Sequence, residues 1–266
     1  MKLCKIIHCA ASLDGNPAEQ AANTITGTKN LLEAMLRCNV RHIIGISTLA
    51  IYDYRKIPGN TELIETSPLE ENFPLRHPYV HAKRRQEDMI KDFATTHSWR
   101  YTILRPGLVY GPGRTWFHHL GMQLAPKQWL CLAANGLLPL THVENCATAI
   151  VSCLEKEAAN KEIINLIDDN IPNRKQYMQT LANLTSTDIN IISIPWLPLN
   201  IASTICSWIN EKLLLGKLPL PDILSAASLQ SRCKPVLYSN KKAKSLLQWQ
   251  PEIGYKDGLE RCRECL

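Results

Sequence analysis

The sequence predicts an α/β fold built around a parallel β-sheet, and three observations support this. Short apolar runs of strand length alternate with segments of helical periodicity through the first two thirds of the chain. Strands that are separated by helix-length segments are typical of βαβ units, which place parallel strands side by side. A chain of 266 residues, 45% of them hydrophobic and 20% charged, can bury a core as one large domain or as one domain with an appended lobe.

The first elements are a strand, a helix and a second strand. Lys5–Cys9 is a continuous apolar run of strand length. Ala18–Cys38 carries apolar residues at helical spacing, which places them on one face of a helix. His42–Ser47 is the next apolar strand. All three segments fit one βαβ unit.

A polar, proline-containing loop separates this unit from the next pair of elements. We predict a helix over Tyr79–Thr96 and a strand over Tyr101–Arg105, which Pro106 ends. Further along, Val143–Glu155 is a helix candidate and Glu162–Ile167 is another buried strand. These segments extend the alternation of strands and helices.

The segment Ile191–Asn210 carries no charged residue, so a membrane span has to be considered. Pro195 and Pro198 interrupt it, and the uninterrupted apolar stretch falls short of the ~20 residues that a bilayer requires. We expect a helix that covers a substrate pocket. Weak membrane contact through residues 191–210 is the alternative.

Composition excludes several classes of function. The formal net charge is +6, but the basic residues are scattered and only 6% of residues are aromatic, which argues against a nucleic-acid partner. The ten cysteines are spread over a chain too long to need disulfide stapling, and the N-terminal apolar run is too short for a signal peptide. We therefore expect reduced thiols in a cytoplasmic protein. Cys262 and Cys265 have the spacing of a metal or redox pair but no second pair nearby, so we expect no metal site.

Tyr79 and Lys83 form the sharpest local signal for catalysis. A spacing of four residues on a helix puts both side chains on one face, one turn apart. A tyrosine with a pKa near ~10 is a poor base at neutral pH, but a nearby ammonium favours the phenolate and lowers that pKa. Such a pair can exchange a proton with a substrate hydroxyl while a hydride moves at the adjacent carbon. The same spacing on an exposed helix would be only a solvated pair.

The position of neighbouring residues supports the catalytic interpretation. Ile43–Thr48 is an apolar strand that ends in two hydroxyl residues, and Leu104–Gly113 ends the next strand. Ligands of open parallel sheets bind beyond the carboxyl ends of the strands. Thr48 would therefore hold a substrate oxygen beside Tyr79.

Several segments form an ordered set of motifs. They are His8-Cys-Ala10-Ala11, Asn23-Thr-Ile-Thr-Gly27-Thr28, Ile46–Tyr52, Tyr79 with Lys83, Leu104–Gly113, Leu138–Ile150 and Tyr238–Pro251. In this order they resemble the extended short-chain dehydrogenase/reductase family, from its H-x-A-A turn and N-x-x-x-G-T helix to its C-terminal tryptophan motif. That family includes NAD-dependent epimerases, dehydratases and hydroxysteroid dehydrogenases. The resemblance runs from about Leu3 to Leu259.

The resemblance implies a Rossmann-like, doubly wound parallel sheet, here N-terminally truncated, with a smaller C-terminal substrate lobe. Residues 1–115 would form the truncated dinucleotide-binding domain. Residues 116–266 would form mostly the substrate lobe, with 138–168 returning to the sheet. A homodimer through the helices Ala18–Cys38 and Tyr79–Thr96 is what the family suggests.

The resemblance also implies roles for individual residues. Tyr79 would be the acid/base, Lys83 its electrostatic support and a ligand of the nicotinamide ribose, and Thr48, rather than Ser47, the group that polarises the substrate oxygen. NAD or NADP would be the cofactor. Its binding residues would be Ala10, Ala11, Asn23, Tyr79, Lys83 and Pro106.

One part of the family pattern is not found. The family's glycine-rich turn, G-x-x-G-x-x-G, precedes the H-x-A-A motif, which here begins at His8. The residues that cradle the pyrophosphate and choose between NAD and NADP are therefore missing, and Lys5–Cys9 would lie at an unpaired sheet edge. A misassigned start, strands supplied by another chain and a cofactor-free remnant would each explain this.

Two functions follow from the sequence. The first is an NAD(P)-dependent oxidoreductase or epimerase that acts on a secondary alcohol or ketone of a nucleotide sugar or a sterol-like substrate. Arg114 and Arg174 could meet a diphosphate, although single arginines are more often surface residues. The alternative is a catalytically inactive remnant, a binding or scaffold protein that no longer holds a dinucleotide. Intact Thr48, Tyr79 and Lys83 favour the enzyme.

Overall fold

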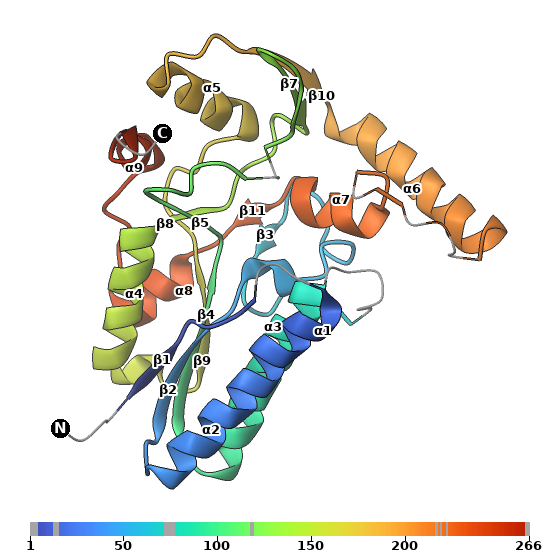
Figure 1. Cartoon of the computed structure of the whole chain (residues 1–266). Coiled ribbons are helices and arrows are strands. Elements are labelled where there is room, and N and C mark those ends of the chain that lie inside the picture. The colour runs from blue at the N-terminus through green and yellow to red at the C-terminus, as the bar shows by residue number, and fades with distance from the viewer. Residues whose placement is uncertain are drawn as a thin grey trace.

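A parallel four-stranded sheet forms the centre of the molecule (Figure 1). The computed structural model describes residues 5–12, 16–71, 78–117, 120–215, 218, 220–221 and 223–263. The strands of this sheet lie in the order β1 (Ile6–His8), β2 (His42–Ile46), β4 (Arg100–Pro106) and β9 (Glu162–Leu166). All three pairings between them are parallel. The predicted α/β fold with a parallel sheet is confirmed.

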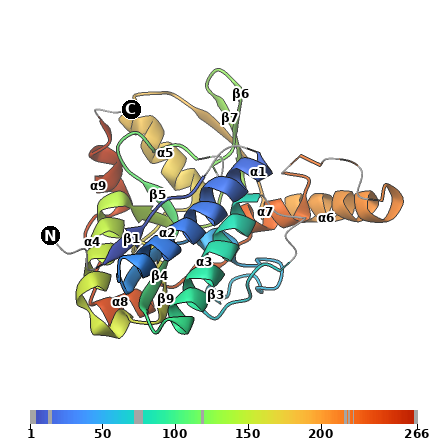
Figure 2. The ribbon, with the colours of Figure 1, turned by 60° about the horizontal axis from the view of Figure 1, so that its bottom comes forward.

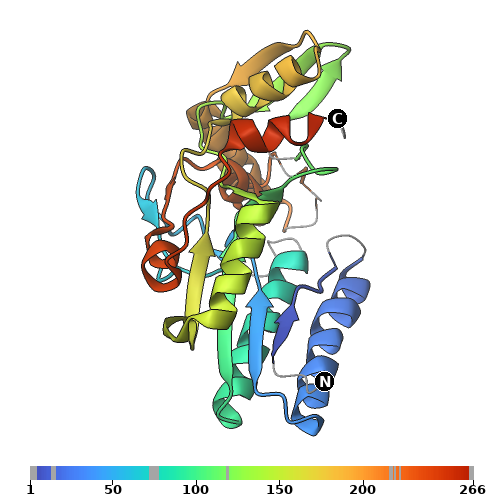
Figure 3. The same ribbon diagram turned by 90° about the vertical axis from the view of Figure 1, so that its left-hand side faces the viewer.

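Helices cover both faces of this sheet (Figures 1 and 3). On one face, α2 (Gly27–Arg37) and α3 (Pro78–Thr96) pack in a cluster that includes Ile43 of β2. On the other face, α4 (Val143–Glu155) and α8 (Lys241–Leu247) pack in a cluster that includes the next residue, Ile44. Successive side chains of a strand point to opposite faces, so a sheet covered on both sides needs the continuous apolar runs that the sequence shows.

The edge of the described sheet is β1. It pairs with β2 from Ile6↔Ile43 to His8↔Gly45, and Ile7 is 42% exposed. The sequence predicted an apolar strand at a sheet edge here, and the described residues show that arrangement.

The predicted helix over Ala18–Cys38 is present but has three parts. A short helix α1 (Pro17–Gln20) continues into the π-helical turn η1 (Ala21–Thr26) and then into α2. The wider π-turn was not predicted, because apolar spacing does not separate it from an ordinary α-helical turn.

The remaining elements lie outside the central sheet. Three small sheets pair β5 (Leu108–Tyr110) with β8 (Leu140–His142), β3 (Glu62–Leu63) with β11 (Leu237–Tyr238), and β7 (Gln128–Leu132) with β6 (Met122–Ala125) and β10 (Asn190–Ile194). The helical segments are η2 (Leu49–Ile51), η4 (Glu157–Ala159), α5 (Arg174–Leu184), α6 (Trp196–Leu213), α7 (Ala226–Cys233) and α9 (Tyr255–Glu260). The predicted division of the chain at residue 115 stays a prediction.

The uncharged segment Ile191–Asn210 differs from the single helix that the sequence predicted. Its first residues form β10, which pairs with β7 in parallel from Asn190↔Gln128 to Ile194↔Leu132. Pro195 caps the next element, α6, because a proline ends the strand and is tolerated just before a helix. Among the residues that the structure describes, no helix combines the length and the apolar character needed to cross a bilayer.

A buried ion pair joins α3 to β4. Arg105 donates from Nε to Oε1 of Glu87 at 2.9 Å and from Nη2 to Oε2 at 2.7 Å, and each residue is only 1% exposed. Arg105 also donates from Nη1 to the hydroxyl of Tyr52 at 2.8 Å, and that hydroxyl donates to Oδ1 of Asn165 at 2.8 Å. Charged groups inside a protein need such complete pairing, because an unpaired buried charge is strongly destabilising.

We expect Glu87→Gln to lower the free energy of unfolding by about 3–5 kcal/mol, because it leaves the guanidinium of Arg105 buried without its counter-charge. Asp88→Asn is the matched control on the same helix, since Asp88 pairs at the surface with Arg84 and Lys91 and should contribute less than ~1 kcal/mol. Urea unfolding followed by circular dichroism measures both. Equal losses in the two variants would contradict the assigned importance of the buried pair.

Candidate active site

A cavity of about 840 Å³ opens at the carboxyl ends of the central strands. Ser47 and Thr48 line it just after β2, and Pro106 and Gly107 line it at the end of β4. Tyr79 and Lys83 enter it from the first turns of α3, and residues of α6 and α7 form the opposite wall. The cavity therefore lies where open parallel sheets bind their ligands.

Tyr79 and Thr48 contact each other in this cavity through a side-chain hydrogen bond. The backbone of Thr48 is extended (φ −163°, ψ 152°), and its Oγ1 accepts from the backbone N of Ala50 at 3.2 Å at the start of η2. Burial raises the pKa of the Tyr79 hydroxyl. The Thr48 hydrogen bond and the positive charge of Arg114 act in the opposite direction on that pKa.

Lys83 is 3% exposed and its ammonium is fixed by two hydrogen bonds. Nζ donates to the backbone O of Ile46 at 2.7 Å and to Oε1 of Gln86 at 2.9 Å. Burial lowers the pKa of Lys83 to about 8, which leaves it mostly protonated at neutral pH. The Tyr79–Lys83 spacing predicted that Lys83 would lower the pKa of Tyr79; burial instead raises this pKa, and Thr48 and then Arg114 are the groups that oppose the rise.

Lys83 belongs to a polar network that reaches β1. The amide Nε2 of Gln86 lies 2.9 Å from Nε2 of His8 and 3.0 Å from Oγ1 of Thr28, and it donates to the backbone O of Ala10 at 3.3 Å. His8 Nε2 lies 2.9 Å from Oγ1 of Thr28. Burial and then the charge of Lys83 lower the pKa of His8 to about 4, so His8 is neutral at physiological pH.

The remaining predicted binding residues divide into two groups. Ala11 and Pro106 line the cavity, as do Thr48, Tyr79 and Lys83. Ala10 offers its carbonyl to Gln86 instead, and Asn23 is exposed on the π-turn and is not a lining residue.

The two arginines that the sequence raised as diphosphate ligands also differ. Arg114 is exposed and lines the cavity. Arg174 is 1% exposed and donates to the backbone carbonyls of Ala133 and Arg232, so it is a core residue rather than a surface residue. Its guanidinium joins the start of α5 to α7.

Sequence reasoning missed the polar wall of the cavity. It consists of Ser207 and Asn210 of α6 with Ser225, Ser228 and Ser231 at and within α7. The three-residue spacing of the α7 serines was a usable signal, because it places them on one helical face. Nothing in the sequence indicated that this face would point at Thr48 and Tyr79.

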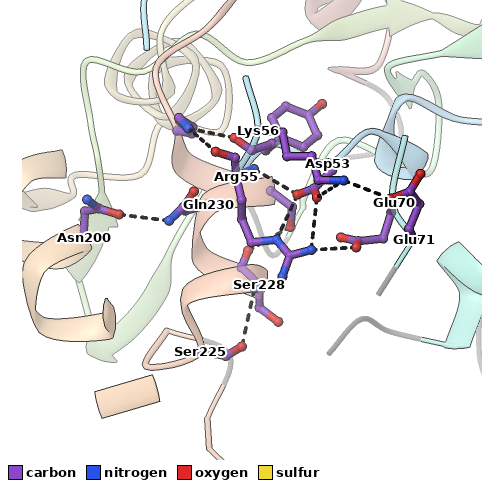
Figure 4. Close-up of polar contacts among 12 residues, drawn as sticks. Asp53, Arg55, Lys56, Glu70, Glu71, Asn200, Ser225, Ser228 and Gln230 are labelled. Carbon is purple, nitrogen blue, oxygen red and sulfur yellow. Dashed lines mark hydrogen bonds and ion pairs between the residues drawn. The ribbon is translucent and has the colours of Figure 1, made fainter. Parts of the chain in front are cut away.

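A cluster around the buried carboxylates of Asp53 and Glu70 positions the loop after η2 against α7 (Figure 4). Arg55 donates to Oδ1 of Asp53 at 2.8 Å and to Oε1 of Glu70 at 2.7 Å. Lys234, just after α7, donates from Nζ to the backbone O of Tyr54 at 2.7 Å, and Tyr54 lines the cavity. These contacts hold Tyr54, and with it one side of the cavity, in place.

The described residues contain no candidate metal site. In that part of the chain, no group of three or more histidine, cysteine or carboxylate side chains is placed to hold a metal ion. Cys262 is buried and its Sγ donates to the backbone O of Gly258 at 3.0 Å, while Cys265 lies outside the described residues.

Comparison with known proteins shows the family of the chain. The family model described as "NAD dependent epimerase/dehydratase family" matches residues 3–166. The sterol-4-alpha-carboxylate 3-dehydrogenase (decarboxylating) of Saccharomyces cerevisiae is 24% identical over 96% of this chain and 74% of its own length. The N-acetyl-alpha-D-glucosaminyl-diphospho-ditrans,octacis-undecaprenol 4-epimerase of Escherichia coli O157:H7 is 26% identical over 71% of this chain and 56% of its own length.

Solved structures share the fold. The UDP-glucose 4-epimerase of Thermotoga maritima, solved with UDP-glucose, has a TM-score of 0.71 at 20% identity and covers 98% of this chain and 76% of its own. The UDP-glucuronic acid 4-epimerase of Bacillus cereus, solved in complex with NAD, has a TM-score of 0.70 at 18% identity over 97% of this chain and 72% of its own. At these identities the likeness shows the fold alone, which is the predicted Rossmann-like one.

We expect the free energy of unfolding to decrease as the pH is lowered, because of His8. Its pKa is about 4 in the folded chain against 6.5 ordinarily, so the unfolded chain takes up the proton first as the pH falls. The stabilisation that neutral His8 gives the folded chain is fully present above pH 6.5. It is lost between pH 6.5 and 4, which lowers the free energy of unfolding by up to about 3 kcal/mol. Urea unfolding across this range should show a shallower pH dependence for His8→Asn.

The control for this prediction is His81→Asn, which changes an exposed histidine on α3. It should keep the pH dependence of the unchanged chain. If His8→Asn kept the full slope as well, the acid sensitivity would have another origin.

Proposed function

The chain belongs to the NAD-dependent epimerase/dehydratase family, and we propose that it is an NAD(P)-dependent oxidoreductase or epimerase acting on a secondary alcohol or ketone. The observation that carries this proposal is the Thr48–Tyr79 hydrogen bond in a cavity that Lys83 also lines. The chain spans 74% of the length of the yeast relative and 56% of the length of the bacterial epimerase. The activity of a whole protein of this family is therefore a proposal for this chain.

Each of the three residues has a role in the proposed reaction. The Tyr79 hydroxyl exchanges a proton with the substrate oxygen, and the Thr48 hydroxyl holds that oxygen in place. Lys83 is fixed by Ile46 and Gln86 and contributes a positive charge to the cavity. At neutral pH the raised pKa of Tyr79 favours the protonated form, which suits donation of a proton to a ketone that is being reduced.

The residues beside this group fit a nicotinamide cofactor. Ala11 and Gly107, with small or no side chains, line the cavity together with Lys83, whose ammonium is a donor for ribose hydroxyls. The cofactor would supply the hydride transfer when bound. The family model and the NAD complex of the Bacillus cereus structure support this assignment.

The substrate is proposed to be a nucleotide sugar or a sterol-like alcohol. The relatives include a sterol carboxylate dehydrogenase and a sugar-diphospholipid epimerase. The cavity offers surface for both, since Leu108, Val109 and Leu220 are apolar while Ser228 and Arg114 are polar or charged. Turnover assays with a UDP-sugar panel and with 3-hydroxysterols separate the two classes.

We expect Tyr79→Phe to lower turnover by on the order of 10²–10⁴-fold, because it removes the proton-exchanging hydroxyl and keeps the ring. The dissociation constant for NAD(P)H should stay within about 3-fold, since the hydroxyl acts on the substrate oxygen. Steady-state kinetics and fluorescence titration measure the two quantities. Tyr101→Phe on β4 is the matched control and should leave both unchanged, whereas a parallel loss of turnover and of cofactor affinity in Tyr79→Phe would contradict the assigned role.

We expect this chain to bind NAD(H) or NADP(H) in calorimetry, and Lys83→Met to weaken that binding by about 10-fold or more through loss of a charged donor. Lys56→Met is the control, because Lys56 pairs with Glu71 at the surface. A stably folded chain that bound no dinucleotide would instead support the cofactor-free binding protein that the sequence left as the alternative.

A further inference from the structure

Helix α6 exposes its apolar side to solvent. Leu197, Ile201, Ile205, Trp208 and Leu213 are 65%, 51%, 52%, 56% and 67% exposed, and Ile209 beside them is 38% exposed. These six residues recur every few positions and form one side of the helix, called here the α6 apolar face. A surface helix in a water-soluble domain normally turns such residues toward the core.

The opposite side of α6 packs on the protein through polar residues and through Trp196 and Leu199, which lie in an apolar cluster with Leu229 and Cys233 of α7. Ser203 is fully buried. Ser207 Oγ accepts from the backbone N of Ala226 at 2.9 Å, and the side chain of Asn210 both donates to the backbone O and accepts from the backbone N of Leu218. Asn200 accepts from Gln230 of α7 at 3.4 Å (Figure 4). The orientation of α6 is therefore fixed by specific hydrogen bonds, and these hold the apolar side outward.

The shape and charge of the α6 apolar face fit a lipid surface better than a single partner helix. At 100° per residue, its residues spread over roughly 160° of the helix circumference, which is wider than the seam of a helix pair. The exposed side chains from Leu197 to Ile209 include no charge. Trp208 and, one turn on, Lys212 are residue types that favour the membrane–water interface.

The surface also leads to the mouth of the cavity. Leu214, Leu215 and Leu218 extend the apolar exposure beyond the C-terminal end of α6, at 44%, 75% and 51%. Leu218 lines the cavity, as do Ser207 and Asn210 on the packed side of the same helix. Figures 1 and 2 show α6 extending away from the rest of the molecule, where a flat surface can reach it.

We propose that the α6 apolar face seats the protein on an anionic phospholipid membrane, with the cavity mouth close to the lipid. The helix lies in the interface and does not cross it, because no described helix has the properties of a span. The formal net charge of +6 adds attraction to anionic headgroups. This proposal does not depend on the proposed reaction.

Vesicle flotation tests the proposal. The full chain is mixed with vesicles of phosphatidylcholine and phosphatidylglycerol at roughly 7:3, and with phosphatidylcholine alone. We expect the chain to float with both, and more with the anionic vesicles. Ile201→Ser/Ile205→Ser should lower the floated fraction by about 5-fold or more, since it removes apolar area from the centre of the face.

The matched control is Val143→Ser/Val151→Ser, which changes two β-branched residues on α4 that are 43% and 50% exposed. It should float like the unchanged chain, and circular dichroism should show all three proteins folded. Absence of flotation, or flotation that the α6 variant does not reduce, would overturn the proposal. A dimer that dissociates in the α6 variant, without vesicle binding by the unchanged chain, would overturn it in favour of a second copy.

Discussion

The buried ion pair between Arg105 and Glu87 is the constraint on which the geometry of the site depends. Glu87 lies one helical turn beyond Lys83 on α3, and Arg105 lies next to the end of β4. Their two-pronged contact fixes both the rotation of α3 and its height along the sheet. Tyr52, just after η2, accepts from the guanidinium and donates in turn to Asn165 of β9, so the elements that meet at the cavity share one polar centre.

A second polar network carries this constraint to the edge of the sheet. Lys83 donates to Gln86, and the amide of Gln86 contacts His8 on β1 and Thr28 on α2. The low pKa of His8 follows from this arrangement, because a buried imidazole near an ammonium is favoured in its neutral form. The first turns of α3 are thus held by contacts with β1 and α2 as well as by the ion pair with β4. The side chains that enter the cavity therefore come from a rigid element.

The other wall of the cavity has a different construction. α6 and α7 are joined by an apolar cluster that includes Trp196 and Leu199, and by hydroxyl and amide side chains such as Ser207 and Asn210, which hold the residues that follow α6. The packed side of α6 thus combines polar and apolar contacts, while the α6 apolar face is exposed. A helical segment that is uncharged from Trp196 to Asn210 is compatible with either orientation, and the contacts with α7 select one.

The sequence by itself determined the parallel sheet and the elements that carry the site. Continuous apolar runs of strand length specify strands that are buried on both faces, and the alternation with helical segments specifies parallel neighbours. The spacing of Tyr79 and Lys83 on one helix, and the position of Thr48 after a strand, were sufficient to place all three near the carboxyl ends of the central strands.

Only the tertiary structure decided which groups act on one another. Burial raises the pKa of Tyr79, and Thr48 and then Arg114, rather than Lys83, oppose that rise. The first residues of 191–210 form a strand because they pair with β7. The apolar side of α6 faces outward because its other side contacts α7. Such outcomes depend on residues far apart in the chain, and the period of a local pattern carries no information about them.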